Sequence, residues 1–251
     1  MKPKQRQSHI LDVVAREGEA TVDALAEEFG VSAETIRRDL AQLATSGALQ
    51  KVHGGARRLR LHAEGSFQER MSEDAAAKQV IAEKLVTVIE PGDTLFMDTG
   101  TTTLFCAEAL AETERLTVIT NSIRVAQALS RGAGRARVFL LGGSYGADNA
   151  QTSGPIALDQ IERFQADHAV LSVAAVDPVA GAADADIDEA QIARRMMANA
   201  TNLIIVAQAA KLGRKAAHKV CRLDEIDMLV CDTMPGDAFR AALDAAHVEI
   251  R

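Results

Sequence analysis

From residue 94 to the C-terminus, short apolar runs alternate with segments of helical spacing, and this alternation limits the possible folds more than any other feature. The apolar runs predict strands at Thr94–Met97, Leu116–Thr120, Val138–Leu141, His168–Val176, Leu203–Ala207 and Asp227–Cys231. The helical spacing predicts a helix that ends at Leu110 and others at Ile123–Leu129, Ile156–Phe164, Ile187–Ala200 and Asp237–Ala246. Strands that alternate with helices form a parallel sheet covered by helices, so an α/β domain is expected. Because aromatic residues make up only 3% of the chain, Ala, Val, Leu and Ile must build its core.

The first 60 residues follow a different pattern, that of a small helical module. Apolar positions predict helices at Ser8–Ala15 and at Val22–Phe29, with Thr21 as the N-cap and Gly30 as the C-cap of the second. A third helix is expected between Ser32 and Gly47. Two helices joined by a tight glycine turn form a helix-turn-helix. The Gly54-Gly55 pair between two extended stretches then predicts a hairpin, which after a helix-turn-helix is a wing.

Charge divides the chain at the same place. The net charge of −7 by itself argues against a nucleic-acid partner. Residues 1–60, however, carry 10 Lys and Arg against 8 Asp and Glu, whereas residues 61–251 carry 18 against 27. This small excess is a weak signal by itself. Together with the helix-turn-helix and wing, it predicts a DNA-binding domain over residues 1–60, a linker over 61–74 that leads into a helix at Ala75–Val88, and an acidic domain over 75–251.

Several classes of site are not supported by the sequence. The three cysteines are far apart and form no C-x-x-C pair, so buried structural thiols are expected instead of disulfides or zinc ligands. The six histidines are scattered, and there is no P-loop or nucleophile elbow. We expect no metal, no cofactor and no catalytic residue. No apolar run approaches the length of about 20 residues that spans a membrane, and a cytoplasmic location is the default expectation.

The third helix carries the residues that are candidates for reading DNA. Ile36, Leu40 and Leu43 mark its buried face, which leaves polar side chains near its N-terminus on the outside. That end of a recognition helix enters the major groove, and arginine suits both guanine and phosphate. The predicted DNA-binding residues are Ser32, Thr35, Arg37 and Arg38 on the helix and Lys51, His53, Arg57 and Arg58 on the wing. The competing interpretation is a solvated charged face on a structural helix.

A second set of candidates lies where ligands bind in parallel sheets, beyond the carboxyl ends of the strands. The stretch Asp98-Thr99-Gly100-Thr101-Thr102 follows a predicted strand and opens a helix, an arrangement that suits a phosphate group. Such a turn is also a common structural device. The residues predicted to bind such a ligand are Asp98, Gly100, Thr101, Thr102, Asn121, Gly142, Gly143, Glu189 and Lys211. Lys211 could neutralise a phosphate or be a solvated loop lysine, and Glu189 could orient a ligand hydroxyl or only favour the start of its helix.

The residues Val31-Ser32 through Leu40, Gly47 and His53-Gly54-Gly55-Ala56 resemble the winged helix-turn-helix signature of the DeoR family of bacterial transcriptional regulators. The resemblance continues through the rest of the chain at Phe67, Arg70, Lys78, the 98–102 stretch, Thr120-Asn121, Gly142-Gly143, Gly154, Glu189, Lys211 and Asp232. It implies a repressor, usually of a sugar or polyol catabolic operon, that a phosphorylated metabolite releases. It also implies a sensor domain similar in fold to ribose-5-phosphate isomerase and CoA transferases, with the effector pocket at the former active site.

Two stretches depart from the pattern of that family. The chain reads Gln208-Ala209-Ala210-Lys211 where the family often has an acidic residue, and Ser172-Val173-Ala174-Ala175 where it tends to have glycines. Both departures bear on the identity of the effector and not on the fold.

The sequence leaves more than one function open. Our expectation is a homo-oligomeric repressor, a dimer or tetramer, whose partners are double-stranded operator DNA and a sugar or polyol phosphate. One alternative is an isomerase-like enzyme acting on sugar phosphates, with the N-terminal module as an accessory. The other is a DNA-binding protein whose sensor domain no longer senses.

Overall fold

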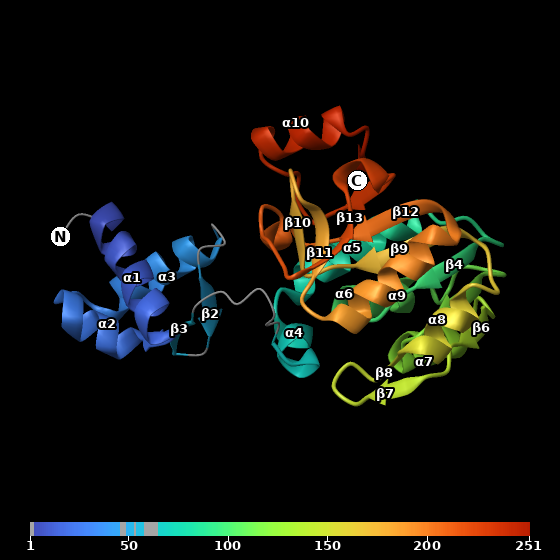
Figure 1. The fold of residues 1–251 in the computed structure, drawn as a ribbon, viewed down its shortest axis with the longest axis horizontal. Coiled ribbons are helices and arrows are strands. Elements are labelled where there is room, and N and C mark those ends of the chain that lie inside the picture. Colours follow the sequence, from blue (N-terminus) through green and yellow to red (C-terminus); the bar gives the residue numbers. More distant parts are fainter. Residues whose placement is uncertain (1–2, 46–48, 53, 58–64) are drawn as a thin grey trace. The chain divides into compact units, whose positions relative to one another are not determined.

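The computed structural model describes residues 3–45, 49–52, 54–57 and 65–251, and the chain divides into two compact units. The N-terminal unit spans Met1–Ala63 and the C-terminal unit spans Glu64–Arg251 (Figure 1). Each unit has a hydrophobic core of its own. The domain limits at residues 60 and 74 stay predictions, but the segment expected as a linker is not all linker, because Phe67–Ser72 form the helix α4.

The N-terminal unit has the expected three helices and hairpin. Its elements are α1 (Pro3–Glu17), β1 (Glu19–Thr21), α2 (Val22–Phe29), α3 (Ala33–Thr45), β2 (Gln50–Val52) and β3 (Gly55–Arg57). Thr21 Oγ1 accepts a hydrogen bond from Ala24 N at 3.2 Å, and Gly30 adopts a left-handed conformation with φ 61°, so both predicted caps of α2 are confirmed. The strand β1 was not predicted; it pairs with β3 to make an antiparallel sheet in the order β1-β3-β2.

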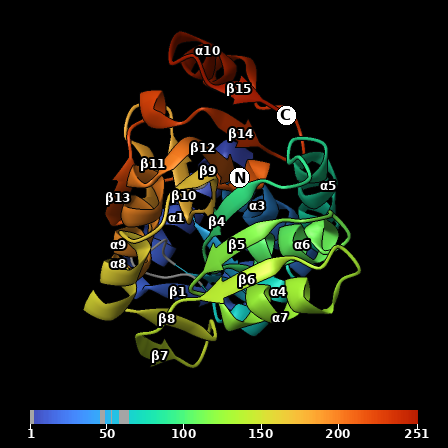
Figure 2. The same cartoon turned by 90° about the vertical axis from the view of Figure 1, so that its right-hand side faces the viewer.

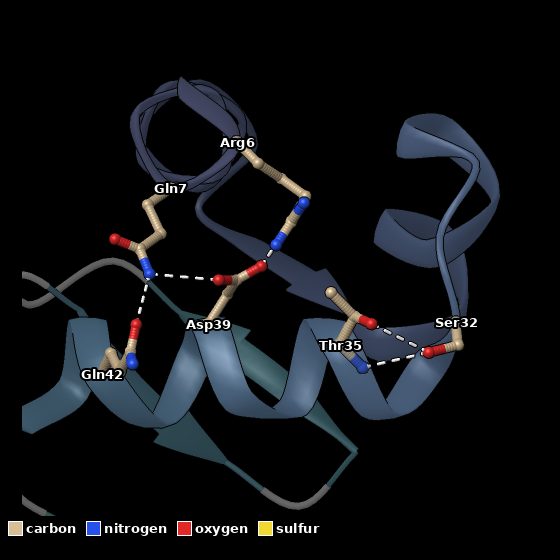
Figure 3. A network of polar contacts seen from close by, with 6 residues as sticks. All are labelled: Arg6, Gln7, Ser32, Thr35, Asp39 and Gln42. Atoms are coloured by element: carbon tan, nitrogen blue, oxygen red, sulfur yellow. Dashed lines mark hydrogen bonds and ion pairs between the residues drawn. The ribbon is translucent and has the colours of Figure 1, made fainter. Parts of the chain in front are cut away.

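A buried ion pair joins the first and third helices of this unit. Arg6 Nε lies 2.5 Å from Asp39 Oδ2, and the two side chains are only 9% and 6% exposed (Figure 3). Gln7 Nε2 donates to Asp39 Oδ1 at 3.0 Å and to Gln42 Oε1 at 2.6 Å. Two neighbouring residues of α1 are thus bonded to two residues one turn apart on α3, so this network sets the position of α3 against α1.

The C-terminal unit is built on a parallel seven-stranded sheet. The strand order is β15-β14-β12-β9-β4-β5-β6, and every neighbouring pair is parallel. The strands span Glu249–Ile250 (β15), Met228–Val230 (β14), Ala200–Val206 (β12), Ala166–Ser172 (β9), Thr94–Met97 (β4), Thr117–Thr120 (β5) and Arg137–Leu140 (β6). The predicted α/β class is confirmed.

Helices cover both faces of this sheet, as Figure 2 shows. One face is covered by α5 (Ala75–Val86), α6 (Thr101–Leu110) and α7 (Ile123–Arg131), and the other by α8 (Pro155–Ile161) and α9 (Ile187–Ala198). Successive side chains of a strand point to opposite faces, so Leu95 and Met97 join one core and Phe96 joins the other. The helix α10 (Asp237–Ala245) adds Leu243 to the core that contains Phe96.

The smaller strands are where the sequence-based expectations were incomplete. The predicted strand His168–Val176 is two strands, β9 and β10 (Ala175–Asp177), because the chain leaves the large sheet after Ser172. The strand β10 forms an antiparallel sheet with β11 (Gly181–Asp184) and β13 (His218–Cys221). Two further strands, β7 (Ser144–Gly146) and β8 (Gln151–Ser153), form a hairpin. The unit also holds two short 3-10 helices, η1 (Ala209–Lys211) and η2 (Leu223–Glu225).

The three cysteines are buried and free, as expected. Burial raises the pKa of the Cys221 thiol to about 12, which keeps it protonated and unreactive at neutral pH. Among the helices that the structure describes, none has the length and apolar character needed to cross a bilayer.

The network of Asp39 leads to the first prediction. We expect Asp39→Ala to lower the free energy of unfolding of the N-terminal unit by about 3–5 kcal/mol, because it leaves the Arg6 guanidinium buried without its counter-charge. The matched control is Glu34→Ala on the same helix, since Glu34 is 63% exposed and only pairs with surface arginines. Its cost should stay under about 1 kcal/mol. Urea denaturation of both variants measures the difference, and equal losses would contradict a structural role for the buried pair.

Candidate functional site

The exposed side of α3 is the first candidate surface. Ser32 caps the helix, since Thr35 N donates to Ser32 Oγ at 3.3 Å and the two hydroxyl oxygens lie 2.9 Å apart (Figure 3). The side chains of Arg37 and Arg38 are 57% and 80% exposed, and Glu34 is 3.6 and 3.8 Å from them. Ile36, Leu40 and Leu43 are buried on the opposite side, as predicted. The helix therefore presents two arginines and a hydroxyl near its N-terminus while its apolar face holds it in the core.

The predicted wing residues are only partly described. Lys51 on β2 is exposed and Arg57 on β3 is half-buried, whereas His53 and Arg58 lie outside the described residues. The close pairing of β3 with β1 requires glycine at position 55, because a Cβ there would lie 2.3 Å from the Ala20 carbonyl oxygen. The glycine that suggested a turn in the sequence thus also permits the three-stranded sheet.

Sequence reasoning missed Arg6 and Asp39 as residues that position the candidate DNA-reading helix. Asp39 directly follows the two exposed arginines, and it looks like part of the same charged stretch. The sequence did contain one indication of its role. Asp39 adjoins Leu40 on the buried side of the helix, and a buried carboxylate needs a partner of opposite charge or a hydrogen-bond donor.

The carboxyl edge of the large sheet is the second candidate site. Asp98 follows β4, Asn121 follows β5 and the Gly142-Gly143 pair follows β6. Lys211 follows β12 in η1, and Glu189 lies in the first turn of α9. The predicted residues therefore come from five different segments that meet at or beside one edge of the sheet.

The end of β9 joins two of these segments. Both carboxylate oxygens of Asp98 accept from Ser172 N, at 3.2 and 3.1 Å, and the Ser172 hydroxyl donates to the Thr99 carbonyl at 3.1 Å. Lys211 Nζ donates to the carbonyl of Val173 at 2.6 Å. Ser172, one of the departures from the family pattern, thus braces the turn that leads into α6.

Gly100 is required in that turn by its surroundings and by its backbone. It adopts φ 146°, a conformation that residues with a Cβ rarely reach. A Cβ at this position would also lie 2.3 Å from Ser172 Oγ and 3.1 Å from Thr103 Oγ1. The buried threonines 101, 102 and 103 follow in the first turn of α6.

The strand β8 joins the remaining segments. Asn121 Nδ2 donates to the Thr152 carbonyl at 2.9 Å, and Gln151 Nε2 donates to Glu189 Oε1 at 2.8 Å. Gly143 adopts φ 144°, and a Cβ there would lie 2.4 Å from the Ser153 carbonyl oxygen. Gly142 N donates to Gln160 Oε1 at 2.7 Å, which ties the end of β6 to α8.

Two buried polar atoms at this edge have no hydrogen-bond partner among the described residues. They are Thr99 Oγ1 and Asn121 Oδ1, on residues that are 5% and 1% exposed. Buried oxygens without partners are uncommon in folded proteins, and each calls for a bonding group that the described residues do not supply. Both follow strands of the same sheet, where ligands of α/β proteins bind.

The charges of this edge are unusual for buried groups. Burial, with Asp184 and Glu189 nearby, raises the pKa of Asp98 well above its usual range, although the Ser172 N–H opposes the shift. A buried base is shifted as well, because burial and the neighbouring Lys211 lower the pKa of Lys78 to about 8. Lys78 is 2% exposed. The sequence indicates it only as one of the residues that resemble the DeoR family, and not as a member of a binding site. The described residues hold no group of three His, Cys, Asp or Glu side chains able to bind a metal ion.

Family models match both units of the chain. The DeoR-like helix-turn-helix domain matches residues 6–60, and the DeoR C-terminal sensor domain matches residues 73–233. The chain belongs to the DeoR family. It is 33% identical to the HTH-type transcriptional repressor CsqR of Escherichia coli, over 98% of this chain and 94% of the relative. The glycerol-3-phosphate regulon repressor of Escherichia coli is 29% identical over 100% and 99%, and the repressor GlcR of Bacillus subtilis 30% identical over 100% and 96%.

Solved structures add information about the fold alone. A chain of the tetrameric eIF2B-beta2-delta2 complex from C. thermophilum aligns with a TM-score of 0.51 and 14% identity, over 96% of this chain and 86% of that one. Ribose 5-phosphate isomerase A from Methanocaldococcus jannaschii aligns with a TM-score of 0.41 and 14% identity, over 56% and 55%. This DeoR-family chain is a DNA-binding transcriptional regulator. The relatives that match the chain over nearly its whole length are named as repressors, so the isomerase alternative is not supported.

The contact between Gly100 and Ser172 gives the second prediction. We expect Gly100→Ala to lower the free energy of unfolding by about 1–3 kcal/mol, because the new methyl group overlaps the Ser172 hydroxyl. Adding Ser172→Ala should recover part of that loss by removing the hydroxyl. The control is Gly154→Ala, where φ is +86° but nothing lies within 4 Å of a new Cβ, so only backbone strain is tested. If thermal denaturation shows no recovery in the double variant, the overlap is not the cause.

Proposed function

We propose that this regulator represses an operon for the catabolism of a sugar or polyol, and that a phosphorylated sugar or polyol releases it from its operator. The observation that carries the DNA-binding half is the pair of exposed arginines at the capped start of α3. Support for the metabolic half comes from the relatives, one of which is named for the glycerol-3-phosphate regulon.

In the proposed complex, α3 lies in the major groove and the wing contacts the backbone. Ser32, Thr35, Arg37 and Arg38 face the bases, and Lys51, His53, Arg57 and Arg58 face phosphates. Arginine can bond two atoms of a guanine edge at once, and each such contact contributes about 1–3 kcal/mol of discrimination. The charge excess of the first 60 residues is only +2, so a single copy should bind weakly. We infer a homo-oligomer, because a second linked module raises the effective concentration at a two-part operator.

Arg38→Ala tests the assignment of the recognition helix. We expect at least about tenfold weaker binding to the regulator's own promoter region, because a base or phosphate contact of about 1–3 kcal/mol is lost. The matched control is Arg16→Ala at the end of α1, where the arginine is 67% exposed and pairs with Glu17. Mobility shift at fixed salt measures both variants, and circular dichroism checks that each is folded. Unchanged binding by Arg38→Ala would show that α3 does not read this DNA.

For the effector, we place a phosphate at the start of α6 and the hydroxyl groups of the ligand against the acidic residues. The backbone N–H groups at a helix N-terminus attract anions, and Gly100 is the N-cap residue of α6. Thr101, Thr102, Gly142 and Gly143 would line this end, with Lys211 as a source of positive charge. Asp98, Asn121 and Glu189 would then accept hydrogen bonds from ligand hydroxyls. The unpartnered oxygens of Thr99 and Asn121 are the observation that favours a polar ligand at this place.

Thr99→Val tests this placement with little disturbance of the fold. The substitution keeps the shape and removes a hydroxyl that has no partner among the described residues, so stability should be unchanged or slightly higher. Binding of the effector should fall by about tenfold, the value of one hydrogen bond.

Calorimetric titration with a panel of sugar and polyol phosphates, followed by mobility shift, measures the effect. The control is Thr103→Val, because Thr103 Oγ1 already donates to the Gly100 carbonyl at 3.2 Å. It should show the reverse pattern, with lower stability and nearly unchanged affinity. No heat and no release of DNA with any member of the panel would instead favour a sensor that no longer senses.

A further inference from the structure

Residues 148–151, at the hairpin between β7 and β8, are bonded to three separate elements of the C-terminal unit. Asp148 Oδ2 accepts from Phe67 N of α4 at 3.0 Å, and the carbonyl of Ala150 accepts from Ile123 N of α7 at 2.9 Å. Gln151 Nε2 donates to Glu189 of α9 at 2.8 Å. This segment therefore connects α4 with the residues that surround the carboxyl edge of the sheet.

Asn149 is the junction of these contacts, because it uses both ends of its side-chain amide. Its Oδ1 accepts from the Arg70 guanidinium of α4 at 2.5 Å, and its Nδ2 donates to Glu189 Oε1 at 2.5 Å. Both bonds involve a charged group, and such bonds are stronger than those between neutral groups. Arg70, Asn149 and Glu189 thus form a continuous chain from α4 to the first turn of α9, which we call the relay.

The helix α4 depends on its surroundings for its stability. It has six residues, far fewer than an isolated helix needs in water. Phe67 is 3% exposed, and the guanidinium of Arg124 lies 4.2 Å from the centre of its ring. Lys78 Nζ donates to the carbonyls of Arg70 and Glu73 at the C-terminal end of the helix. A change in any of these contacts therefore affects whether the helix is formed.

The position of α4 along the chain makes its stability matter. It is the first helix or strand described after β3, and residues 58–64, between them, lie outside the described residues. We propose that Arg70 and Asn149 are positioning residues through which the state of Glu189 sets the stability of α4.

The consequence for regulation rests on the proposed function, since it requires the effector to contact Glu189. A ligand hydroxyl that donates to the Glu189 carboxylate competes with Asn149 for the same oxygen, which weakens the hold of Asn149 on Arg70. The effector then shifts α4 toward a less ordered state. The size of the shift is set by the difference between the effector's affinities for the protein with α4 ordered and with α4 less ordered. Because α4 begins the C-terminal unit, this shift reaches the end of the segment that leads to the DNA-binding unit.

Hydrogen–deuterium exchange on the full chain tests the relay without any ligand. In Glu189→Ala and in Asn149→Ala, amides of residues 67–73 should exchange about tenfold faster or more, since each variant removes a bond to a charged group from the relay. The matched control is Asp188→Ala, which removes the same charge from the same turn of α9 at an exposed position. It should leave exchange in residues 67–73 at the wild-type rate. Glu189 accepts from Gln151 as well as from Asn149, whereas Asn149 is a neutral residue in the turn between β7 and β8, so its alanine variant is expected to fold even if the Glu189 variant does not.

Two results would overturn the relay. One is equal exchange over residues 67–73 in Glu189→Ala and Asp188→Ala. The other is a rise that also covers α5 and β4, which would indicate a general loss of stability. The test is separate from the test of effector binding. If α4 does not respond while Thr99→Val still weakens effector binding, the relay is wrong and the proposed function stands. If α4 responds but no sugar or polyol phosphate releases DNA, the relay stands and the proposed effector is wrong.

Discussion

The contact between the ends of β4 and β9 is the interaction on which the C-terminal unit depends most. The Asp98 carboxylate accepts twice from Ser172 N, and the Ser172 hydroxyl returns a bond to the Thr99 carbonyl. This exchange holds two central strands together at the point where both leave the sheet. It also fixes the backbone of Gly100, so that α6 starts directly beyond the sheet. The same carboxylate is buried and has acidic neighbours, so a structural contact places a strongly perturbed acid at the edge where ligands of other α/β proteins bind.

Much of this architecture could be predicted from the sequence because local and global signals agree. Strands such as Thr94–Met97 are apolar on both faces, which is the pattern of a sheet covered on both sides, and the helices between them have helical spacing. The helix α2 was predicted at its observed limits because both of its caps can be recognised in the sequence. The Thr21 hydroxyl can accept a hydrogen bond from the first turn, and Gly30 has no Cβ to oppose a left-handed conformation. In each of these cases the residues that decide the structure are neighbours in the chain.

The parts that could not be predicted are those decided by distant residues. The strand β11 is short and not strongly apolar, and β13, which lies more than 30 positions later, completes its ladder. The hairpin of β7 and β8 is local, but its strands have no apolar pattern that would reveal them. Arg6 is buried only because Asp39 lies opposite, 33 positions away. The helix α4 lies in a polar stretch that reads as a linker, and Arg124 and Asp148, which hold Phe67, come more than 50 residues later. The candidate effector residues were named one strand end at a time. That Thr99 and Asn121 would keep unpartnered oxygens could be seen only when the strands were brought together.

The distribution of charge explains how a chain with a net charge of −7 can belong to a family of DNA-binding regulators. Affinity for DNA depends on the cations that lie at phosphates and base edges, not on the sum over the whole chain. The N-terminal unit places Arg37 and Arg38 on its surface, whereas Arg6 is buried and pairs with Asp39 across two helices. The acidic residues of the C-terminal unit lower the net charge of the chain without removing these surface cations. Net charge therefore does not argue against DNA binding, because a small number of cations on one exposed helix face is enough for close contacts with phosphates and base edges.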